Sequence, residues 1–160
     1  MSNEKFEIDA KEVIRMLAGL DSKLRKKAYR DGIRKSLTIV RKEAISRLRN
    51  ILGKGASRRK DNYGKTLESG VRYKIYKDAK GGNVNILGNY KLKWFELGTK
   101  PRQNSRKKTT GKLLKKKRPT GQIRPSYFFT KAYESKEKEV FSTLEKNIAD
   151  AIKKINNKQI

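Results

Sequence analysis

The fold class is decided by residues 71–87, which read VRYKIYKDAKGGNVNIL. Val71, Tyr73 and Ile75 alternate with more polar neighbours, a pattern that predicts a β-strand with one buried face. The KGGN sequence at 80–83 is rich in residues that tolerate positive φ, so it predicts the turn of a hairpin. The last four residues of the stretch form the returning strand, and we therefore expect a small antiparallel sheet.

A long basic helix is predicted before this hairpin, from Asp21 to about Leu52. Most of its apolar residues are spaced by three or four positions, which places them on one face of a helix. These residues are Leu24, Ala28, Ile33, Leu37, Val40, Ala44, Leu48 and Ile51. The other faces carry 11 Lys and Arg against three acids, which is typical of a solvated basic surface.

A second long amphipathic helix is predicted near the C-terminal end, about 25 to 30 residues in length, with Pro125 in its first turn. Phe128 and Phe129 are expected as large apolar anchors just inside this helix. The apolar positions that define it are Phe128, Ala132, Val140, Leu144, Ile148, Ala151 and Ile155.

Three shorter segments give weaker patterns. Residues 9–18 predict a short helix that Asp9 caps and Gly19 ends. Residues 53–64 have no periodicity and predict a loop. Residues 90–97 fit neither a strand nor a helix cleanly, so both interpretations stay open.

The chain has 160 residues, of which about a third are apolar, so we expect a single domain that spans residues 1–160. The expected fold class is α+β. A small antiparallel sheet, either a hairpin or three to four strands, packs against a long N-terminal helix and a long C-terminal helix.

The charge is strongly unbalanced, with 43 Lys and Arg against 16 Asp and Glu, which leaves a net charge of +27. Such a charge indicates a partner of opposite charge. Residues 100–131 contain 12 of the basic residues and no acid, and Leu113 and Leu114 are almost the only apolar residues between Pro101 and Pro119. This composition cannot order itself around a core, so it predicts a long basic loop at about 100–123, inserted before the last helix.

The sequence gives little support to catalysis. Cysteine and histidine are both absent, which excludes disulfides, thiolate zinc sites and histidine-based triads. Gly64-Lys65-Thr66 is similar to the end of a phosphate-binding loop, but Arg59 stands where that loop needs a glycine. The acids of the middle of the chain are too dispersed to predict a two-metal nuclease: Asp61, Glu68, Asp78 and Glu96. We therefore expect no enzymatic activity, no metal and no cofactor.

The basic loop favours non-specific contact with nucleic-acid phosphates. There is no aromatic residue between Lys100 and Ser126, so no platform for base stacking is expected where the charge is highest. We expect no membrane partner, because no apolar run approaches 18 residues. Residues 1–10 lack the pattern of a signal peptide, so synthesis in the cytoplasm is expected.

Three segments follow one another along the chain: Tyr63–Val71 (YGKTLESGV), Trp94–Thr99 (WFELGT) and Arg124–Phe129 (RPSYFF), the last followed by the long helix. Together they resemble the tail-component, or tail-completion, family of long-tailed bacteriophages. The resemblance covers roughly residues 9–155. The positions that match its stronger motifs are Phe95, Glu96, Gly98, Thr99, Arg124, Pro125 and Phe128.

The resemblance implies a structural virion protein at the head–tail junction, which helps to complete or join the tail. It also implies a homo-oligomeric ring, for which we guess six subunits, in contact with other neck and tail proteins. We hypothesise that the basic surface faces packaged DNA or an acidic neighbour. The residues assigned to this contact are Lys107, Lys108, Lys115, Lys116, Lys117 and Arg118.

The motif residues also have expected physical roles. Glu96, inside an apolar segment, is expected to be shielded and paired with an arginine or a backbone donor. Gly98 allows a backbone turn, and Thr99 is expected to bond local backbone. Two other functions remain open. One is a free non-specific nucleic-acid-binding protein, ribosome-associated or nucleoid-like. The other is a metal-dependent enzyme on nucleic acid that uses Glu96, for which we expect neither metal-dependent turnover nor loss of activity when Glu96 is replaced.

Overall fold

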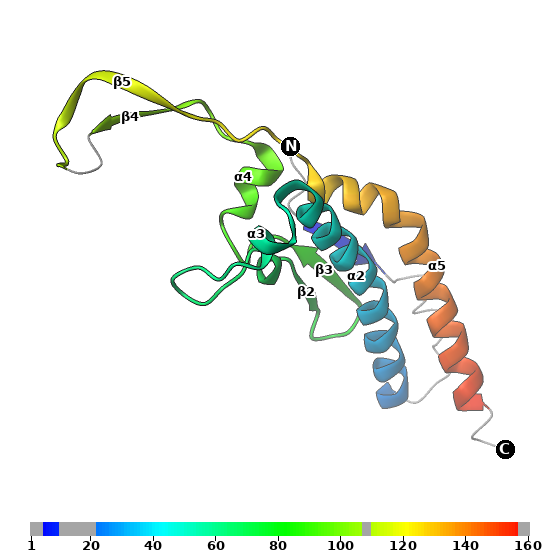
Figure 1. The fold of residues 1–160 in the computed structure, drawn as a ribbon. Coiled ribbons are helices and arrows are strands. Elements are labelled where there is room, and N and C mark those ends of the chain that lie inside the picture. Colours follow the sequence, from blue (N-terminus) through cyan, green and yellow to red (C-terminus); the bar gives the residue numbers. More distant parts are fainter. Residues whose placement is uncertain (1–4, 10–21, 107–109, 157–160) are drawn as a thin grey trace.

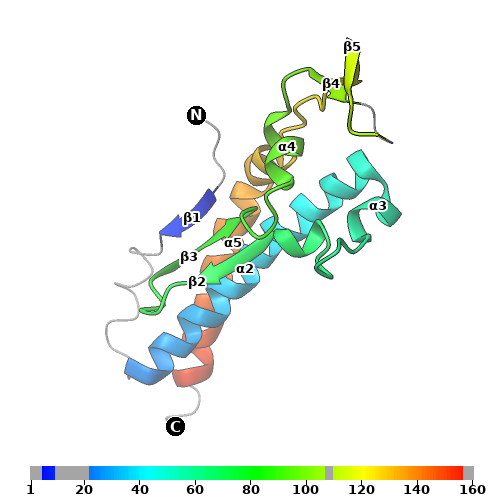
Figure 2. The same cartoon turned by 90° about the vertical axis from the view of Figure 1, so that its left-hand side faces the viewer.

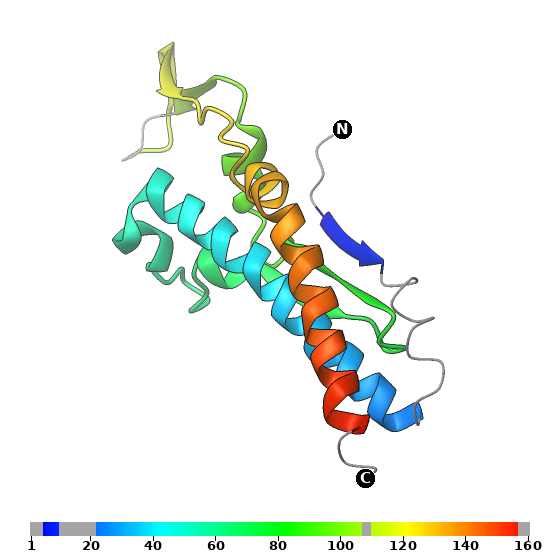
Figure 3. The same cartoon turned by 90° about the vertical axis from the view of Figure 1, so that its right-hand side faces the viewer.

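The computed structural model describes residues 5–9, 22–106 and 110–156 of the chain. Two long helices, α2 and α5, run side by side, and a small sheet lies against α2 (Figures 1 and 3). The elements in chain order are β1 (Lys5–Asp9), α2 (Ser22–Leu52), α3 (Lys54–Arg58), the 3-10 helix η1 (Glu68–Gly70), β2 (Arg72–Ile75), β3 (Gly81–Asn85), α4 (Leu92–Leu97), β4 (Arg102–Arg106), β5 (Leu113–Gly121) and α5 (Phe128–Asn156).

The main sheet has three antiparallel strands in the order β1-β3-β2 (Figure 2). The central strand β3 pairs with β1 from Lys5↔Asn85 to Asp9↔Gly81, and with β2 from Arg72↔Asn85 to Ile75↔Gly82. The strands β4 and β5 form a separate two-stranded antiparallel sheet. The α+β fold class and both long helices are confirmed.

The core lies between α2, α5 and the sheet. Ile33, Leu37 and Leu48 of α2 are fully buried, and they belong to the same cluster as Val84 of β3 and Leu144 of α5. Each large apolar side chain buried in this way contributes roughly 1.5–3 kcal/mol relative to exposure.

The predicted apolar face of α2 is confirmed from Ala28 to Leu48. Its two end positions differ, because Leu24 and Ile51 are each 45% exposed where the helix extends past the core. Tyr29 and Ile45, which the prediction did not include, are buried beside it.

The hairpin is confirmed, but its turn is displaced from the predicted glycines. The turn precedes them: Ala79 has φ 59° and its N–H donates to the Tyr76 carbonyl at 2.9 Å. Gly82 instead lies in β3, where a Cβ atom would stand 2.7 Å from Leu37 Cδ1. The glycine is therefore required by the close approach of the strand to α2.

The predicted buried face of the first strand is only partly correct. Val71 is buried and Ile75 is half-buried, whereas Tyr73 is exposed. The reason is that β2 is an edge strand of the sheet, so a part of its predicted inner face meets solvent.

The remaining segments resolve or correct the weaker predictions. The expected loop at 53–64 contains the short helix α3, and residues 92–97 are helical, which settles the open choice at 90–97. The predicted helix at 9–18 falls outside the described residues except for Asp9, which ends β1. The last helix begins at Phe128, so Pro125 precedes it instead of occupying its first turn.

The predicted basic loop at about 100–123 is a two-stranded ribbon, β4 and β5, which projects away from the long helices (Figure 1). Antiparallel pairing satisfies the backbone groups that face each other across the two strands without requiring an apolar face, so a segment of this composition can form a ribbon outside the core. The pairing contains register shifts, and we refer to residues 102–121 as the ribbon.

Candidate interface at the base of the basic ribbon

The two segments that carry the stronger motifs meet in one junction at the start of α5. The Phe95 carbonyl accepts hydrogen bonds from the backbone N–H of Ser126 at 2.9 Å and from its hydroxyl at 2.5 Å. The Glu96 carbonyl accepts from the N–H of Tyr127 at 3.2 Å. The short helix α4 is thereby fixed against the N-terminal end of α5, about 30 residues later in the sequence.

The side chain of Glu96 caps α5. Its carboxylate is fully buried, and Oε2 accepts from the Phe129 N–H at 2.8 Å. Oε1 accepts from both the N–H and the hydroxyl of Thr130, at 3.1 and 2.7 Å. The first N–H groups of a helix have no partner within it, and the helix dipole favours a negative charge there. The expectation of a shielded carboxylate is confirmed, and of its two expected kinds of partner, an arginine or a backbone donor, the structure shows backbone donors.

Thr99 and Ile123 close the base of the ribbon. The Thr99 N–H donates to the Ile123 carbonyl at 2.9 Å, and the Ile123 N–H donates to Thr99 Oγ1 at 3.0 Å. Thr99 therefore bonds backbone 24 residues away, where the sequence predicted a local bond. Gly98 makes the expected turn with φ 76°, and a Cβ atom on it would stand 2.8 Å from Pro125 Cδ.

Four of the six cations assigned to the basic surface belong to β5: Lys115, Lys116, Lys117 and Arg118. Lys116, Lys117 and Arg118 are exposed. Lys107 and Lys108 lie outside the described residues, as does the side chain of Lys115. Among the other motif residues, Phe128 is buried as expected, and Arg124 is exposed.

A second cluster fixes the loop that follows α3. Arg49 Nε and Nη2 donate to the two carboxylate oxygens of Glu68 at 2.9 and 2.7 Å, and the buried Ser57 hydroxyl donates to Glu68 Oε1 at 2.7 Å. Arg58 Nε adds a contact at 3.5 Å. These bonds, that of Arg49 above all, lower the pKa of Glu68 from 4.5 to about 2. No local pattern predicts this cluster, since Arg49, the Ser57–Arg58 pair and Glu68 come from three separate elements.

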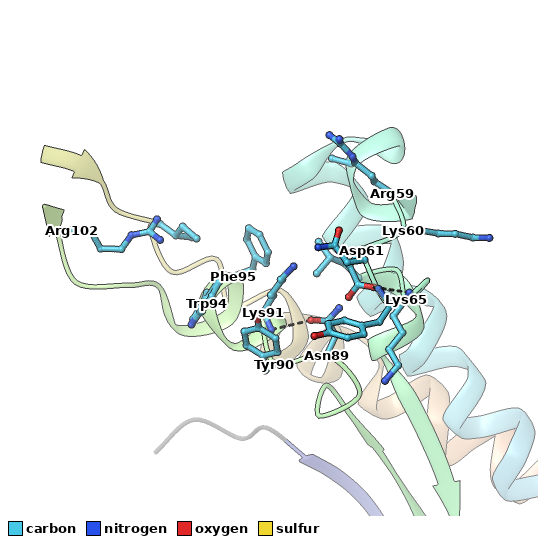
Figure 4. A pocket seen from close by; sticks show the side chains of 15 residues that line it. Arg59, Lys60, Asp61, Lys65, Asn89, Tyr90, Lys91, Trp94, Phe95 and Arg102 are labelled. Atoms are coloured by element: carbon cyan, nitrogen blue, oxygen red, sulfur yellow. Dashed lines mark hydrogen bonds between the residues drawn. The ribbon is translucent and has the colours of Figure 1, made fainter. Parts of the chain in front are cut away.

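A groove of about 630 Å³ lies between the α3–η1 loop, the start of α4 and the base of the ribbon (Figure 4). We call it the aromatic groove. Its lining comprises Ala56, Arg59, Lys60, Asp61, Asn62, Tyr63, Lys65, Leu67, Asn89, Tyr90, Lys91, Trp94, Phe95, Arg102 and Ile123. Five of these residues are basic and four are aromatic.

Two local motifs shape the walls of the aromatic groove. Asp61 Oδ1 accepts from the N–H groups of Tyr63 and Lys65, each at 2.9 Å, which orders the loop that carries Tyr63. The Lys65 N–H is the main cause that lowers the pKa of Asp61, and the charge of Lys91 adds to it. On the opposite wall, Tyr90 and Trp94 meet edge to face with ring centroids 5.4 Å apart.

The aromatic groove could not be predicted from local sequence, because its residues come from four separate stretches of the chain: 56–67, 89–95, Arg102 and Ile123. The basic stretch 100–126 itself contains no aromatic residue. The rings instead come from residues 63 and 90–95, and the fold brings them next to Arg102 at the foot of the ribbon. The signal present in the sequence was the pairing of a tyrosine with nearby lysines in both KDNYGK at 60–65 and NYKLKW at 89–94.

Within the described ranges, no group of three or more His, Cys, Asp or Glu side chains could hold a metal ion. No described helix is long and apolar enough to cross a membrane. Comparison with known proteins finds no matching family model, no similar curated protein and no similar solved structure.

Proposed function

We propose that the protein is a non-catalytic structural subunit of the head–tail junction of a long-tailed bacteriophage, where it helps to complete or join the tail. In this role its location is the virion, and its neighbours are other neck and tail proteins. The proposal rests on the resemblance of its motifs to the tail-completion family and on the shape and charge of the ribbon.

The observation that carries the proposal is a charged ribbon that projects from the fold (Figure 1). Residues 100–123 contain no acid, and the described ribbon cations Arg102, Lys112, Lys116, Lys117 and Arg118 are all exposed. A ribbon of this kind contributes nothing to the core, and its exposed cations are placed to contact a partner of opposite charge. Packaged DNA and an acidic neighbour are the two partners that supply the counter-charge.

The arrangement of the family-like motifs supports the same role. Phe95 to Thr99 and Ile123 to Phe129 together form the junction that holds the ribbon on one side and α5 on the other. The residues behind the resemblance therefore act as a rigid base for the projecting element. A rigid base is what a subunit needs to present a ribbon to its neighbours in a defined direction.

We further propose that the subunits form a closed ring, as the family resemblance implies, with six copies as our guess. A heterologous interface gives a ring when its rotation closes. At +27 per chain the copies repel one another, so ring formation requires a counter-ion, DNA or an acidic protein.

The test is the mass of the native oligomer, measured by light scattering and native mass spectrometry with and without duplex DNA, together with electron microscopy. The proposal expects ring-shaped oligomers that form more readily when the charge is neutralised. A protein that stays monomeric with DNA, with a polyanion and at high salt overturns it.

A second function, that of a free non-specific nucleic-acid-binding protein, is favoured by one observation, the aromatic groove with its five basic lining residues. Salt-dependent binding of DNA or RNA by a persistent monomer favours this alternative. Rings that bind DNA more tightly than the monomer does favour the virion role.

A further inference from the structure

We propose that the aromatic groove binds a short single-stranded segment of nucleic acid. The bases stack on the rings of Tyr63, Tyr90 and Trp94, and the phosphates lie beside the lysines of the two walls. This assignment goes beyond the structural role proposed above, because it concerns an isolated subunit and does not depend on ring formation.

The first support is the exposure of the rings. Tyr63 is 86% exposed, Tyr90 is 65% exposed and Trp94 is 39% exposed, although all three line one groove. Large rings that remain open in a concave site are available for stacking on a planar partner. The edge-to-face contact sets the planes of the Tyr90 and Trp94 rings at 88° to each other, so each ring receives a separate base, in an arrangement that exists before a ligand binds.

The second support is the placement of the cations. Lys60 and Lys65 come from the loop after α3, Lys91 from the turn before α4, and Arg102 from the base of the ribbon, so each segment that borders the aromatic groove carries positive charge. In Figure 4 the Lys60 side chain points away from the rings, so Lys60 contributes charge at the rim of the groove. A groove of this kind follows the phosphate backbone of a single strand while the rings receive its bases.

Asp61 is the one acid among the described residues that line the aromatic groove. Its carboxylate is held by the loop, because Oδ1 accepts two backbone N–H groups, and its single negative charge stands against five basic lining residues. Asp61 therefore serves the structure of the loop, and the lining keeps a net positive charge.

The exposed aromatic rings distinguish between three classes of partner: an acidic peptide, duplex DNA and a single strand. An acidic peptide could neutralise the lysines, but it would leave three rings without a planar group to cover them. In duplex DNA the base faces are stacked on one another, so they are closed to the rings, and the duplex offers phosphates alone. Unpaired bases satisfy both features of the site. The volume of about 630 Å³ is in the range of sites for small ligands, so it accommodates a few nucleotides.

The experiment uses the full chain and its own fluorescence, because Trp94 is the sole tryptophan of the sequence. Titration with a thymidine dodecamer is expected to quench Trp94 emission as a base stacks on the indole. Tyr63→Leu is expected to weaken binding of the dodecamer by about tenfold, within the range found for loss of one stacking ring. The matched control is Tyr73→Leu on β2, an exposed tyrosine outside the groove, and it is expected to leave the affinity unchanged.

Three further probes separate the possible occupants. Polyphosphate, which has charge but no bases, is expected to bind without quenching Trp94. Poly-glutamate and a duplex dodecamer are expected to quench less than the single strand does. The proposal is overturned if the single strand binds without quenching, if poly-glutamate quenches equally, or if Tyr63→Leu and Tyr73→Leu have the same affinity. All readouts are made on the subunit, so a failure of the ring to assemble does not affect them.

Discussion

The carboxylate of Glu96 accepts a hydrogen bond from the backbone N–H of Phe129, 33 residues further along the chain, at 2.8 Å inside the protein. The acid lies on α4, and the donor lies in the first turn of α5. One buried side chain therefore replaces the local cap that α5 lacks in its own sequence, and it joins the helix to the element that carries the ribbon.

Replacing Glu96 is expected to destabilise the protein strongly. Glu96→Ala leaves the N–H groups of Phe129 and Thr130 without their acceptor in a buried site, with a loss of about 2–4 kcal/mol in the free energy of unfolding. Glu96→Gln keeps one acceptor oxygen and is expected to lose less. Urea unfolding followed by circular dichroism measures both losses. Glu139→Gln, on an exposed pair with Lys136, serves as the control and is expected to change stability by less than about 0.5 kcal/mol.

Gly98 is expected to be irreplaceable for two separable reasons. Its φ of 76° disfavours any side chain, and a Cβ atom would also collide with Pro125 and with the Ile123 carbonyl. Gly53, directly after α2, has a similar φ of 77° but has open space around its Cβ position. Gly98→Ala should therefore cost about 1–3 kcal/mol more than Gly53→Ala, the difference being the packing clash. Equal losses in thermal unfolding would show that backbone strain alone decides.

The Arg49–Glu68 pair gives the protein a specific sensitivity to acid. The pKa of Glu68 is lowered to about 2 in the folded protein, so its ionised form stabilises the fold. This stabilisation is complete above the ordinary value of 4.5 and is lost as the pH falls toward 2. We expect the wild type to lose roughly 1–2 kcal/mol more than Glu68→Gln over that interval, a modest figure because Arg49 is 34% exposed and its charge is screened.

The measurement is the free energy of unfolding of both proteins at several pH values between 6 and about 2.5. Other carboxylates titrate over the same interval, but they are common to the two proteins and cancel in the difference. Parallel curves for wild type and Glu68→Gln would contradict the assignment of this acid sensitivity to Glu68.

The two long helices were predictable because spacing alone places their apolar residues on one face, as for Ile33, Leu37 and Val40. The turn was misplaced because Gly82 serves a contact with Leu37 on another element, and a hairpin signal in the sequence does not distinguish that use of glycine from a turn. Local pattern therefore predicts elements, while contacts between elements decide where they begin and end.

The candidate interface likewise contains one feature that local sequence predicts and others that arise only from contacts between elements. The shielding of Glu96 was predictable, because an acid within an apolar segment must find donors. The aromatic groove was not predictable, since β2 and β3 separate Tyr63 from Trp94 in the chain and the two residues line one groove only after folding. The ribbon was missed because its strands have no alternating apolar face, which is the signal that identifies a half-buried strand.

The ribbon is expected to be dispensable for the stability of the rest of the protein. The bonds between Thr99 and Ile123 close its base, so a four-residue Gly-Ser linker in place of residues 102–121 shortens a loop without opening the core. The expected change in the free energy of unfolding is less than about 1 kcal/mol. If urea unfolding of this variant shows no folded state at low urea, the ribbon contributes to the core.

Neutralising the ribbon is expected to reduce duplex DNA binding while leaving the fold intact. The variant replaces with glutamine the six cations assigned from the sequence: Lys107, Lys108, Lys115, Lys116, Lys117 and Arg118. Each phosphate contact that is lost lowers the slope of log affinity against log salt by about 0.9. A slope smaller by about 3 or more, measured by fluorescence anisotropy with a labelled duplex, is the expected result.

The control for this variant must remove the same charge from another surface, because net charge alone steers a protein toward DNA. Exposed lysines of α2 and α5 provide it: Lys42, Lys131, Lys138, Lys146, Lys153 and Lys154. If the ribbon makes the phosphate contacts, this control weakens association only slightly and keeps the salt slope of the wild type. If the slope of log affinity against log salt falls equally in both variants, binding reflects the overall charge of +27, and the ribbon is not a specific contact surface.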